Sequence, residues 1–352
     1  MIKSLSEIAQ VTMGQSPKSE FYNSNNNGLP FLQGRTTFGD KYPTFDTWTT
    51  SWNKEAFSGD ILFTVRAPVG DLNIANCKIA IGRGLAAIHP TNVNNKYLYY
   101  LLLSNKSKFV NTSSGTIFDS INKNALESIK LNVHDSTIQN HIVNTIGSVD
   151  DLIENYNKQV AKLQEIGCKI IDMINDNNES NLMADIVKFE KGYEIGSKKY
   201  YSDLKEQSIH YIRVGDLLNI SNTFVDKEDK LKYCNNNDIL VAFDGAPGRN
   251  NIGLSGAYSS GIYKLVCDEK YKGLIYFEIN SKMNQSIIKD HSQGTTILHA
   301  SKSINYLEYA VFDENDLYYF NSIFNQIISL KNKIYLLNSI KENLLNKYFT
   351  NQ

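Results

Sequence analysis

Two stretches of the chain carry apolar residues at alternating steps of three and four positions, within residues 136–178 and 316–352. This spacing is the 3.5-residue period of a coiled-coil seam, so the pattern predicts two long helices that pair along their apolar faces. Lys341 is the one polar residue that interrupts the second stripe. Packing of each stripe on its own domain is the competing interpretation. The predicted seam residues are Ile142, Ile146, Val149, Ile153, Tyr156, Val160, Leu163, Ile323, Ile327, Leu330, Ile334, Leu337 and Leu344.

The segments that precede the two stripes contain short apolar runs separated by turn residues. Runs at 61–65, 79–81 and 85–88, and at 211–214, 239–243 and 262–266, predict strands. One short helix is expected in each segment, over residues 96–107 and 274–282. The pattern therefore predicts two β-rich α+β domains, at residues 1–135 and 179–315, with a spacer helix after each, at 136–178 and 316–352.

The second half of the chain repeats the landmarks of the first at an offset of about 178 residues. The strand entry at 59–62 lines up with 237–240, and the turn at 67–70 lines up with 246–248. If an approximate two-fold axis relates the two copies, their equivalent helices must run antiparallel. The sequence thus predicts a pseudo-two-fold internal repeat, in which two similar domains are joined by two long antiparallel helices.

Composition sets modest limits on this arrangement. A chain of 352 residues that is 41% hydrophobic can bury two cores of ordinary size. It has no run of 18 apolar residues and no apolar signal region at its start, so neither a membrane span nor secretion is expected. Its four scattered cysteines are typical of reduced thiols in a cytoplasm.

The charge distribution says more than the net charge of −1, which argues against a general polyanion binder. Residues 148–178 carry three basic and six acidic side chains, whereas residues 317–352 carry four basic and one acidic. The opposite signs favour association of the two helices with each other.

Loop residues of both domains have the side chains that proteins use to bind DNA. Arg and Gln form two-pronged hydrogen bonds with guanine and adenine edges, while hydroxyls and Lys bind phosphates. An ordinary solvated loop side chain is the competing interpretation for any one of them. Asp244 stands at the repeat position of Arg66, which predicts that the two domains bind different sequences. The candidates are Gln15, Ser16, Lys18, Gln33, Arg35, Thr36, Arg66, Arg83 and Thr116 in the first domain, and Lys198, Lys199, Tyr200, Arg213, Asp244, Arg249, Asn250, Thr295 and His299 in the second.

No catalytic or metal-binding motif is recognisable in the sequence. It contains no phosphate-binding GxxxxGK[ST] loop and no GxGxxG after a strand. The six histidines lack cysteine or carboxylate partners at metal-ligand spacing. Asp60 and Asp238 recur in the repeat, but each follows Gly or Asn at a strand entry, so they are interpreted as turn formers.

The order of these features resembles the specificity subunits of type I restriction-modification systems. The opening at 5–17 resembles the start of a target recognition domain, and 114–131 resembles its closing segment. The helix entry at 136–142 resembles that of the family's conserved helix. The family usually has prolines where this chain has 133–135 and 312–314, and the second domain lacks the Gly-x-Ser-Pro of the first.

The resemblance implies a non-catalytic subunit that binds a bipartite double-stranded DNA site, one half per domain, with an unread gap set by the helices. It also implies two adenine-methyltransferase subunits as partners, whose cofactor is S-adenosylmethionine, while this chain binds no cofactor itself. Motor-nuclease subunits are a further partner that the resemblance allows. A stand-alone DNA-modifying or DNA-cleaving enzyme with an unrecognised site, and a coiled-coil adaptor that binds protein, are the alternatives.

Overall fold

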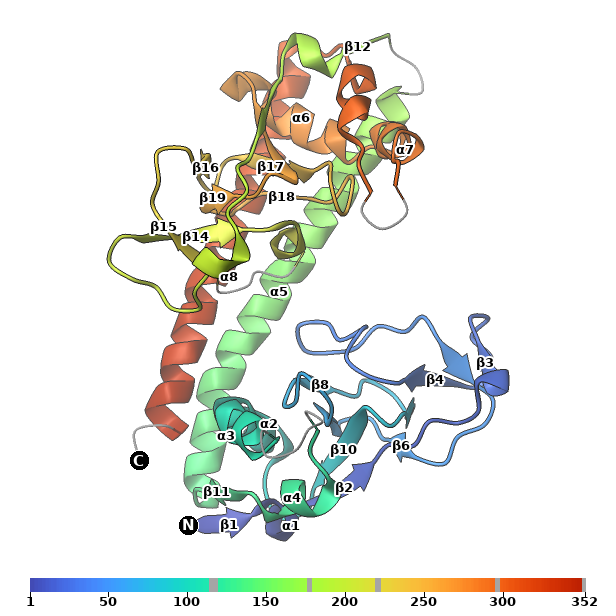
Figure 1. Cartoon of the computed structure of the whole chain (residues 1–352), viewed down its shortest axis with the longest axis vertical. Helices are drawn as coiled ribbons and strands as arrows, with labels where there is room; N and C mark the ends of the chain where they lie inside the picture. Colours follow the sequence, from blue (N-terminus) through green and yellow to red (C-terminus); the bar gives the residue numbers. More distant parts are fainter. Residues whose placement is uncertain (114–119, 176–178, 219–222, 295–297, 350–352) are drawn as a thin grey trace. The chain divides into compact units, whose positions relative to one another are not determined.

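The computed structural model describes residues 1–113, 120–175, 179–218, 223–294 and 298–349. The chain forms two compact units: unit 1 is Met1–Leu152 with Asn338–Gln352, and unit 2 is Ile153–Leu337. The long helices α5 (Ser136–Asn175) and α8 (Glu314–Phe349) each contribute residues to both units (Figure 1). The division into units therefore crosses the two predicted helices and does not fall at their ends.

Unit 1 is built from short strands and short helices in addition to its parts of α5 and α8. Its described strands form sheets of order β1-β11, β2-β10-β7-β8 and β3-β5-β4-β9-β6. The elements are β1 Ile2–Ser4, α1 Leu5–Ile8, β2 Ala9–Met13, η1 Ser19–Phe21, β3 Tyr22–Asn23, β4 Leu29–Leu32, β5 Trp48–Thr49, β6 Glu55–Ala56, β7 Ile61–Thr64, β8 Leu72–Ile74, β9 Ile79–Ile81, β10 Leu85–Pro90, α2 Asn95–Ser104, α3 Lys106–Ser113, α4 Lys123–Ser128 and β11 Lys130–Asn132.

Unit 2 repeats this strand order, which confirms the predicted internal repeat. Its described strands form sheets of order β12-β21, β13-β20-β17-β18 and β15-β14-β19-β16, and a single bridge between Tyr201 and Phe224 takes the place of the β3–β5 pair. The elements are β12 Ser180–Leu182, η2 Met183–Asp185, β13 Lys188–Lys191, η3 Ser197–Lys199, β14 Ser208–Ile212, η4 Val214–Leu217, β15 Phe224–Asp226, β16 Tyr233–Cys234, β17 Ile239–Ala242, β18 Asn250–Asn251, β19 Gly256–Tyr258, β20 Ile262–Val266, η5 Glu269–Tyr271, α6 Lys272–Ile279, α7 Lys282–Asp290, η6 Ser301–Tyr306 and β21 Glu308–Ala310.

The apolar runs at 61–65 and 239–243 form β7 and β17, whose side chains are all buried. Asp60 and Asp238 are turn formers, as predicted: the Oδ2 of Asp60 accepts the amide of Phe57 at 2.8 Å, and that of Asp238 accepts the amide of Asn235 at 2.9 Å. The helices predicted over residues 96–107 and 274–282 are present, but each is divided into two: α2 and α3 in unit 1, and α6 and α7 in unit 2. The chain breaks at a polar residue between them, and in unit 2 the hydroxyl of Ser281 caps α7 by accepting the amide of Asn284.

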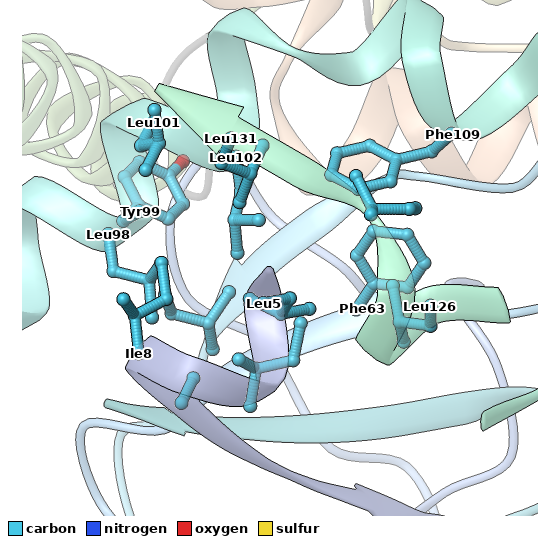
Figure 2. Close-up of a cluster of buried hydrophobic side chains, with 14 of the residues drawn as sticks. Leu5, Ile8, Phe63, Leu98, Tyr99, Leu101, Leu102, Phe109, Leu126 and Leu131 are labelled. Carbon is cyan, nitrogen blue, oxygen red and sulfur yellow. The ribbon is translucent and has the colours of Figure 1, made fainter. Parts of the chain in front are cut away.

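Unit 1 has two clusters of buried hydrophobic side chains, and its helices contribute to the larger one. Figure 2 shows Ile8 of α1 beside Leu98 of α2 in this larger cluster. The rings of Phe63 and Phe109 pack edge to face there, with their centres 5.1 Å apart. Ile142 and Ile146 of α5 and Leu345 of α8 complete the same cluster. Burial of each such side chain stabilises the fold by about 1.5–3 kcal/mol, so the long helices are part of this core.

Contacts within unit 1 show that α5 and α8 pair antiparallel, as predicted. His141 near the start of α5 lies 3.0 Å from the hydroxyl of Tyr348 near the end of α8, measured from Nε2. Further along α5, the carboxylate of Asp150 accepts the ammonium of Lys341 at 2.6 Å. Residue numbers thus rise along α5 while they fall along its partner, which is antiparallel pairing.

The same pairing continues inside unit 2. The ammonium of Lys333 lies 5.6 Å from the centre of the Tyr156 ring, and Val160, Ile327 and Leu330 are buried in one cluster. Gly167 interrupts the predicted seam because α6 packs there: a β-carbon at this residue would lie 2.2 Å from the Phe277 ring. The apolar stripe of each long helix therefore packs on the other long helix. It also packs on the other elements of the units to which that helix contributes.

The polar residue that interrupts the second stripe belongs to a polar layer in unit 1, formed by Tyr100, Asp150 and Lys341. The hydroxyl of Tyr100 donates to the second oxygen of Asp150 at 2.6 Å, in a buried position. Asp150 is 7% exposed. The offset of 178 residues relates Asp150 to Ile328 and Lys341 to Leu163, and both of these apolar residues pack in the core of unit 2. Two of the three polar positions of the layer are therefore apolar in unit 2.

Asp150→Ile is expected to destabilise the protein by about 3–5 kcal/mol, because it leaves the ammonium and the phenol without their acceptor. The triple change Tyr100→Phe, Asp150→Ile and Lys341→Leu replaces every polar group of the layer by an apolar one, with Ile and Leu taken from the equivalent positions of unit 2, and is expected to be neutral or to stabilise. Chemical denaturation of the full chain measures both free energies of unfolding. A triple variant as unstable as the single one would contradict this account.

Unit 2 holds a fully buried carboxylate, Glu278 of α6. One of its oxygens accepts the amide of Ala310 at 2.8 Å, and the other accepts the side-chain amide of Asn175 at 2.9 Å. Burial is the main cause that raises the pKa of Glu278 to about 7. Because the pKa in the folded state lies above the unfolded value of 4.5, this group favours folding most at low pH, and the benefit is lost as pH rises through about 7.

Glu278→Gln is expected to remove this pH dependence, since the amide cannot ionise. The wild-type chain should lose on the order of 3 kcal/mol between pH 5 and pH 8 relative to the variant, as an upper figure. Denaturation curves across that range measure the difference. Glu269→Gln, whose side chain is 82% exposed, is the matched control. Parallel pH profiles of the wild type and the Glu278 variant would refute the assignment.

Candidate nucleic-acid interface

Several candidate residues of unit 1 come together at one edge of its four-stranded sheet. β10 runs antiparallel to both β2 and β7, so the two latter strands end where β10 begins. β4 of the other sheet ends at the same place, because the carbonyl of Leu32 accepts the amide of Gly82 at 2.8 Å. We call the side chains that follow or precede these strand ends edge 1: Gln15, Ser16, Gln33, Arg66 and Arg83.

The backbone of edge 1 is fixed by hydrogen bonds between its loops. The amide of Gln15 donates to the carbonyl of Ile81 at 2.9 Å, and the amide of Arg83 donates to the hydroxyl of Ser16 at 3.1 Å. Gly84 allows the loops to approach, since a β-carbon there would lie 2.4 Å from the carbonyl oxygen of Gln33. The side chains of Gln33, Arg66 and Arg83 are exposed. A rigid backbone thus presents exposed polar groups.

The other candidates of unit 1 are placed less uniformly. Thr36 and Gln33 line a hollow of about 250 Å³ whose wall includes the paired rings of Tyr22 and Phe31. Arg35 donates to the carboxylate of Asp71 at 2.6 Å, so its guanidinium already has an internal partner. Lys18 is exposed and lies 3.8 Å from Glu20. Thr116 lies outside the described residues.

Unit 2 builds the same edge with different side chains. The amide of Tyr193 donates to the carbonyl of Tyr258 at 3.1 Å, and the amide of Ser259 donates to that of Ile212 at 2.9 Å, as in unit 1. Arg66 and Asp244 occupy equivalent bridges, to Ser120 and His299 respectively. We call the residues at the five equivalent positions edge 2: Tyr193, Glu194, Arg213, Asp244 and Ser260.

Charged groups of edge 2 meet in one hollow, whose lining includes Glu194, Arg213 and Asp244. One carboxylate oxygen of Asp244 lies 2.8 Å from Nδ1 of His299, and the other lies 3.6 Å from the ammonium of Lys191. Arg213 lies 3.5 Å from Asp216 and 5.8 Å from the centre of the Tyr200 ring. Edge 2 therefore combines one guanidinium with two carboxylates, whereas edge 1 has two guanidinium groups and no carboxylate.

Three of the remaining candidates of unit 2 have partners inside the unit: Lys199, Arg249 and Asn250. Lys199 pairs with Glu228 at 2.8 Å, while Lys198 is exposed beside it. Arg249 donates to the carbonyl of Val214 at 3.4 Å. Asn250 and Asn280 exchange side-chain amide hydrogen bonds. Thr295 lies outside the described residues.

Three residues of edge 2 were missed in the sequence: Tyr193, Glu194 and Ser260. Each stands at the repeat position of a candidate in unit 1, namely Gln15, Ser16 and Arg83. The repeat offset could have identified Tyr193 and Glu194. Ser260 is recognised only from the structure, because the amides of Gly82 and Ser259 make equivalent backbone bonds.

Two further properties bear on what this interface does. Within the described parts of the chain, no group of three or more His, Cys, Asp or Glu side chains is arranged to hold a metal ion. Of the helices in those parts, none combines the length and the apolarity that a membrane crossing needs.

Comparison with known proteins gives a consistent result. Residues 1–165 match the family described as the type I restriction modification DNA specificity domain. The chain is 40% identical over 167 residues to a protein of Methanocaldococcus jannaschii named as a type I restriction enzyme MjaX specificity subunit. This match covers 47% of the present chain and only 39% of the length of that protein. It is 23% identical over 286 residues to the MjaIX specificity subunit of the same organism, a match that covers 69% of this chain and 66% of that protein.

A solved structure shares the fold over the whole chain. It is the S subunit of a type I restriction-modification system from M. genitalium, with 16% sequence identity and a TM-score of 0.55. The match covers 99% of this chain and 96% of that one. At this identity the likeness concerns the fold, which contains both β-rich units and both long helices.

The position of Arg66 on edge 1 generates a test of the predicted interface. Arg66→Ala is expected to relax discrimination at one base position of a bound duplex, because a two-pronged Arg–guanine contact is worth about 1–3 kcal/mol. Affinities of the full chain for duplexes substituted at each position measure the loss. Lys130→Ala, at the opposite end of unit 1 on β11, is the control. Unchanged discrimination at every position in the Arg66 variant would dismiss this residue as a base reader.

Proposed function

Residues 1–165 match the type I restriction modification DNA specificity domain, and on that premise we propose that the chain is a specificity subunit that reads a bipartite DNA site, one half per unit. The observation that carries the proposal is the pair of equivalent edges. Equivalent backbone bonds hold the loops of both edges at Gln15 and Tyr193, at Gly82 and Ser259, and at Val65 and Phe243, yet the side chains at the five positions differ. A duplicated scaffold with different readers is suited to a split site whose two halves have different sequences.

The unread gap between the half-sites is set, in this proposal, by the paired helices. α5 has 40 residues, which corresponds to about 60 Å at 1.5 Å per residue. One turn of B-DNA is roughly 34 Å, so helices of this length span nearly two turns of a duplex and are long enough to hold two half-sites apart. Because α5 and α8 pass without interruption from one unit into the other, each unit is attached to a stiff element.

The chemistry belongs to partners in this proposal. Two adenine-methyltransferase subunits, which use S-adenosylmethionine, would bind the chain, because a duplicated protein presents each docking surface twice. Methylation of adenine requires the base to leave the duplex stack, and the methyltransferase would perform that step as well. A motor-nuclease subunit would be a further partner where unmodified DNA is cleaved. The chain's own contribution is recognition.

Mapping of methylated adenines tests this function. A host that lacks other adenine methyltransferases is given the cognate methyltransferase with or without this chain. Methylation at a split motif is expected only when the chain is present, because the methyltransferase needs it to find the site. An unchanged pattern of methylation would count against the proposal, as would a motif without a gap.

A further inference from the structure

We propose that edge 2 selects a base by its exocyclic amino group through the carboxylate of Asp244, whereas edge 1 selects guanine through Arg66. This inference rests on the proposed function, since it concerns the bases that the second unit reads. It follows from an exchange at one position of a duplicated scaffold, where a donor in unit 1 is replaced by an acceptor in unit 2.

The carboxylate of Asp244 is held in place but not saturated. His299 lies 2.8 Å from one oxygen, and Lys191 lies 3.6 Å from the other. An ionised carboxylate has about four acceptor positions, so these two neighbours leave acceptor capacity for a ligand. The side chain is 18% exposed and lines the hollow of edge 2, where a ligand can reach it.

The pattern of donors in the major groove gives this carboxylate its selectivity. Cytosine presents its N4 amino group and adenine its N6 amino group, whereas guanine and thymine present acceptors. A carboxylate attracts the first pair and repels the second. Arg66, at the equivalent position of unit 1, has the opposite preference and matches the O6 and N7 of guanine. Asp244 should therefore select adenine or cytosine on the DNA strand whose base it contacts.

A purely structural role for the Asp244–His299 pair is the alternative. The pair would then fasten the segment around His299 to the end of β17. Backbone bonds already do this, since the amide of Ala300 donates to Phe243 at 2.7 Å and that of Gly245 to Leu298 at 2.8 Å. Unit 1 holds the equivalent segment by the amide of Ile121, which donates to Val65 at 3.0 Å. Fastening alone therefore does not require the carboxylate.

The test compares methylated motifs produced by the full chain with its methyltransferase. For Asp244→Ala, one position that the wild type restricts to adenine or cytosine should become degenerate, with discrimination reduced roughly tenfold, as expected for a base contact of about 1–3 kcal/mol. The other half-site should stay the same. Asp185→Ala is the control, because Asp185 is an exposed carboxylate that precedes the start of β13, whereas edge 2 follows the end of that strand. This variant should leave both half-sites unchanged. An unaltered motif in the Asp244 variant overturns the inference.

Two further arms separate the possible failures. His299→Ala removes the same contact but keeps the carboxylate, so this variant should preserve the selected base. If it shows the same degeneracy as the Asp244 variant, the effect belongs to the structural role of the pair.

If the Asp244 variant gives no methylation, binding is measured on duplexes in which purine replaces adenine or 2-pyrimidinone replaces cytosine. Loss of the amino group should weaken wild-type binding, and insensitivity of the wild type overturns the inference. Absence of any split motif with the wild-type chain would instead refute the proposed function.

Discussion

The apolar seam between α5 and α8 is the contact on which both cores depend. Ile142 and Ile146 of α5 meet Leu345 of α8 in unit 1, and Val160 meets Ile327 and Leu330 in unit 2. Neither unit has a complete core without segments that are far apart in the sequence. The helices run antiparallel because the start of α5 contacts the end of α8. The ion pair between Asp150 and Lys341 adds a contact that forms in only one register of the two helices. A protein built in this way cannot lose the helix pairing without losing both units.

A second consequence of the duplication is that the scaffold and the readers are separated. Backbone amides and carbonyls fix the loops of both edges, and close approach at Gly84 requires that no side chain intervene. The Ser16 hydroxyl, which accepts the amide of Arg83, is the side chain of edge 1 that takes part in fixing these loops. The backbone bonds involve no variable group, so the other side chains can change without altering the loops. Arg66 and Asp244 differ in charge on equivalent bridges. The same constraint that makes the edges rigid therefore lets the two units differ in what they bind.

The sequence predicted most of the fold because periodicity is a local signal and the duplication can be recognised directly in the residues. The long helices and the strands β7 and β20 could be inferred from spacing, and the antiparallel pairing could be inferred from the duplication. Contacts between residues that are distant in the sequence could not be inferred in this way. Examples are the ion pair of Lys341 with Asp150 and that of Arg35 with Asp71. For the same reason the list of candidate DNA-binding residues mixed exposed edge positions with residues held inside a unit. Selection by residue type finds groups able to bind DNA, but only the backbone brings them together.

The most direct test of the central claim is to lengthen both helices at the residues where the division into two units crosses them. One heptad inserted after Leu152 and one after Leu337, each with the apolar spacing of the seam, keeps the pairing in register. Seven residues add about 10 Å, so the unread gap of the methylated motif should grow by about three base pairs while both half-sites stay the same. A correctly folded variant that methylates the original motif, with its gap unchanged, would contradict the account.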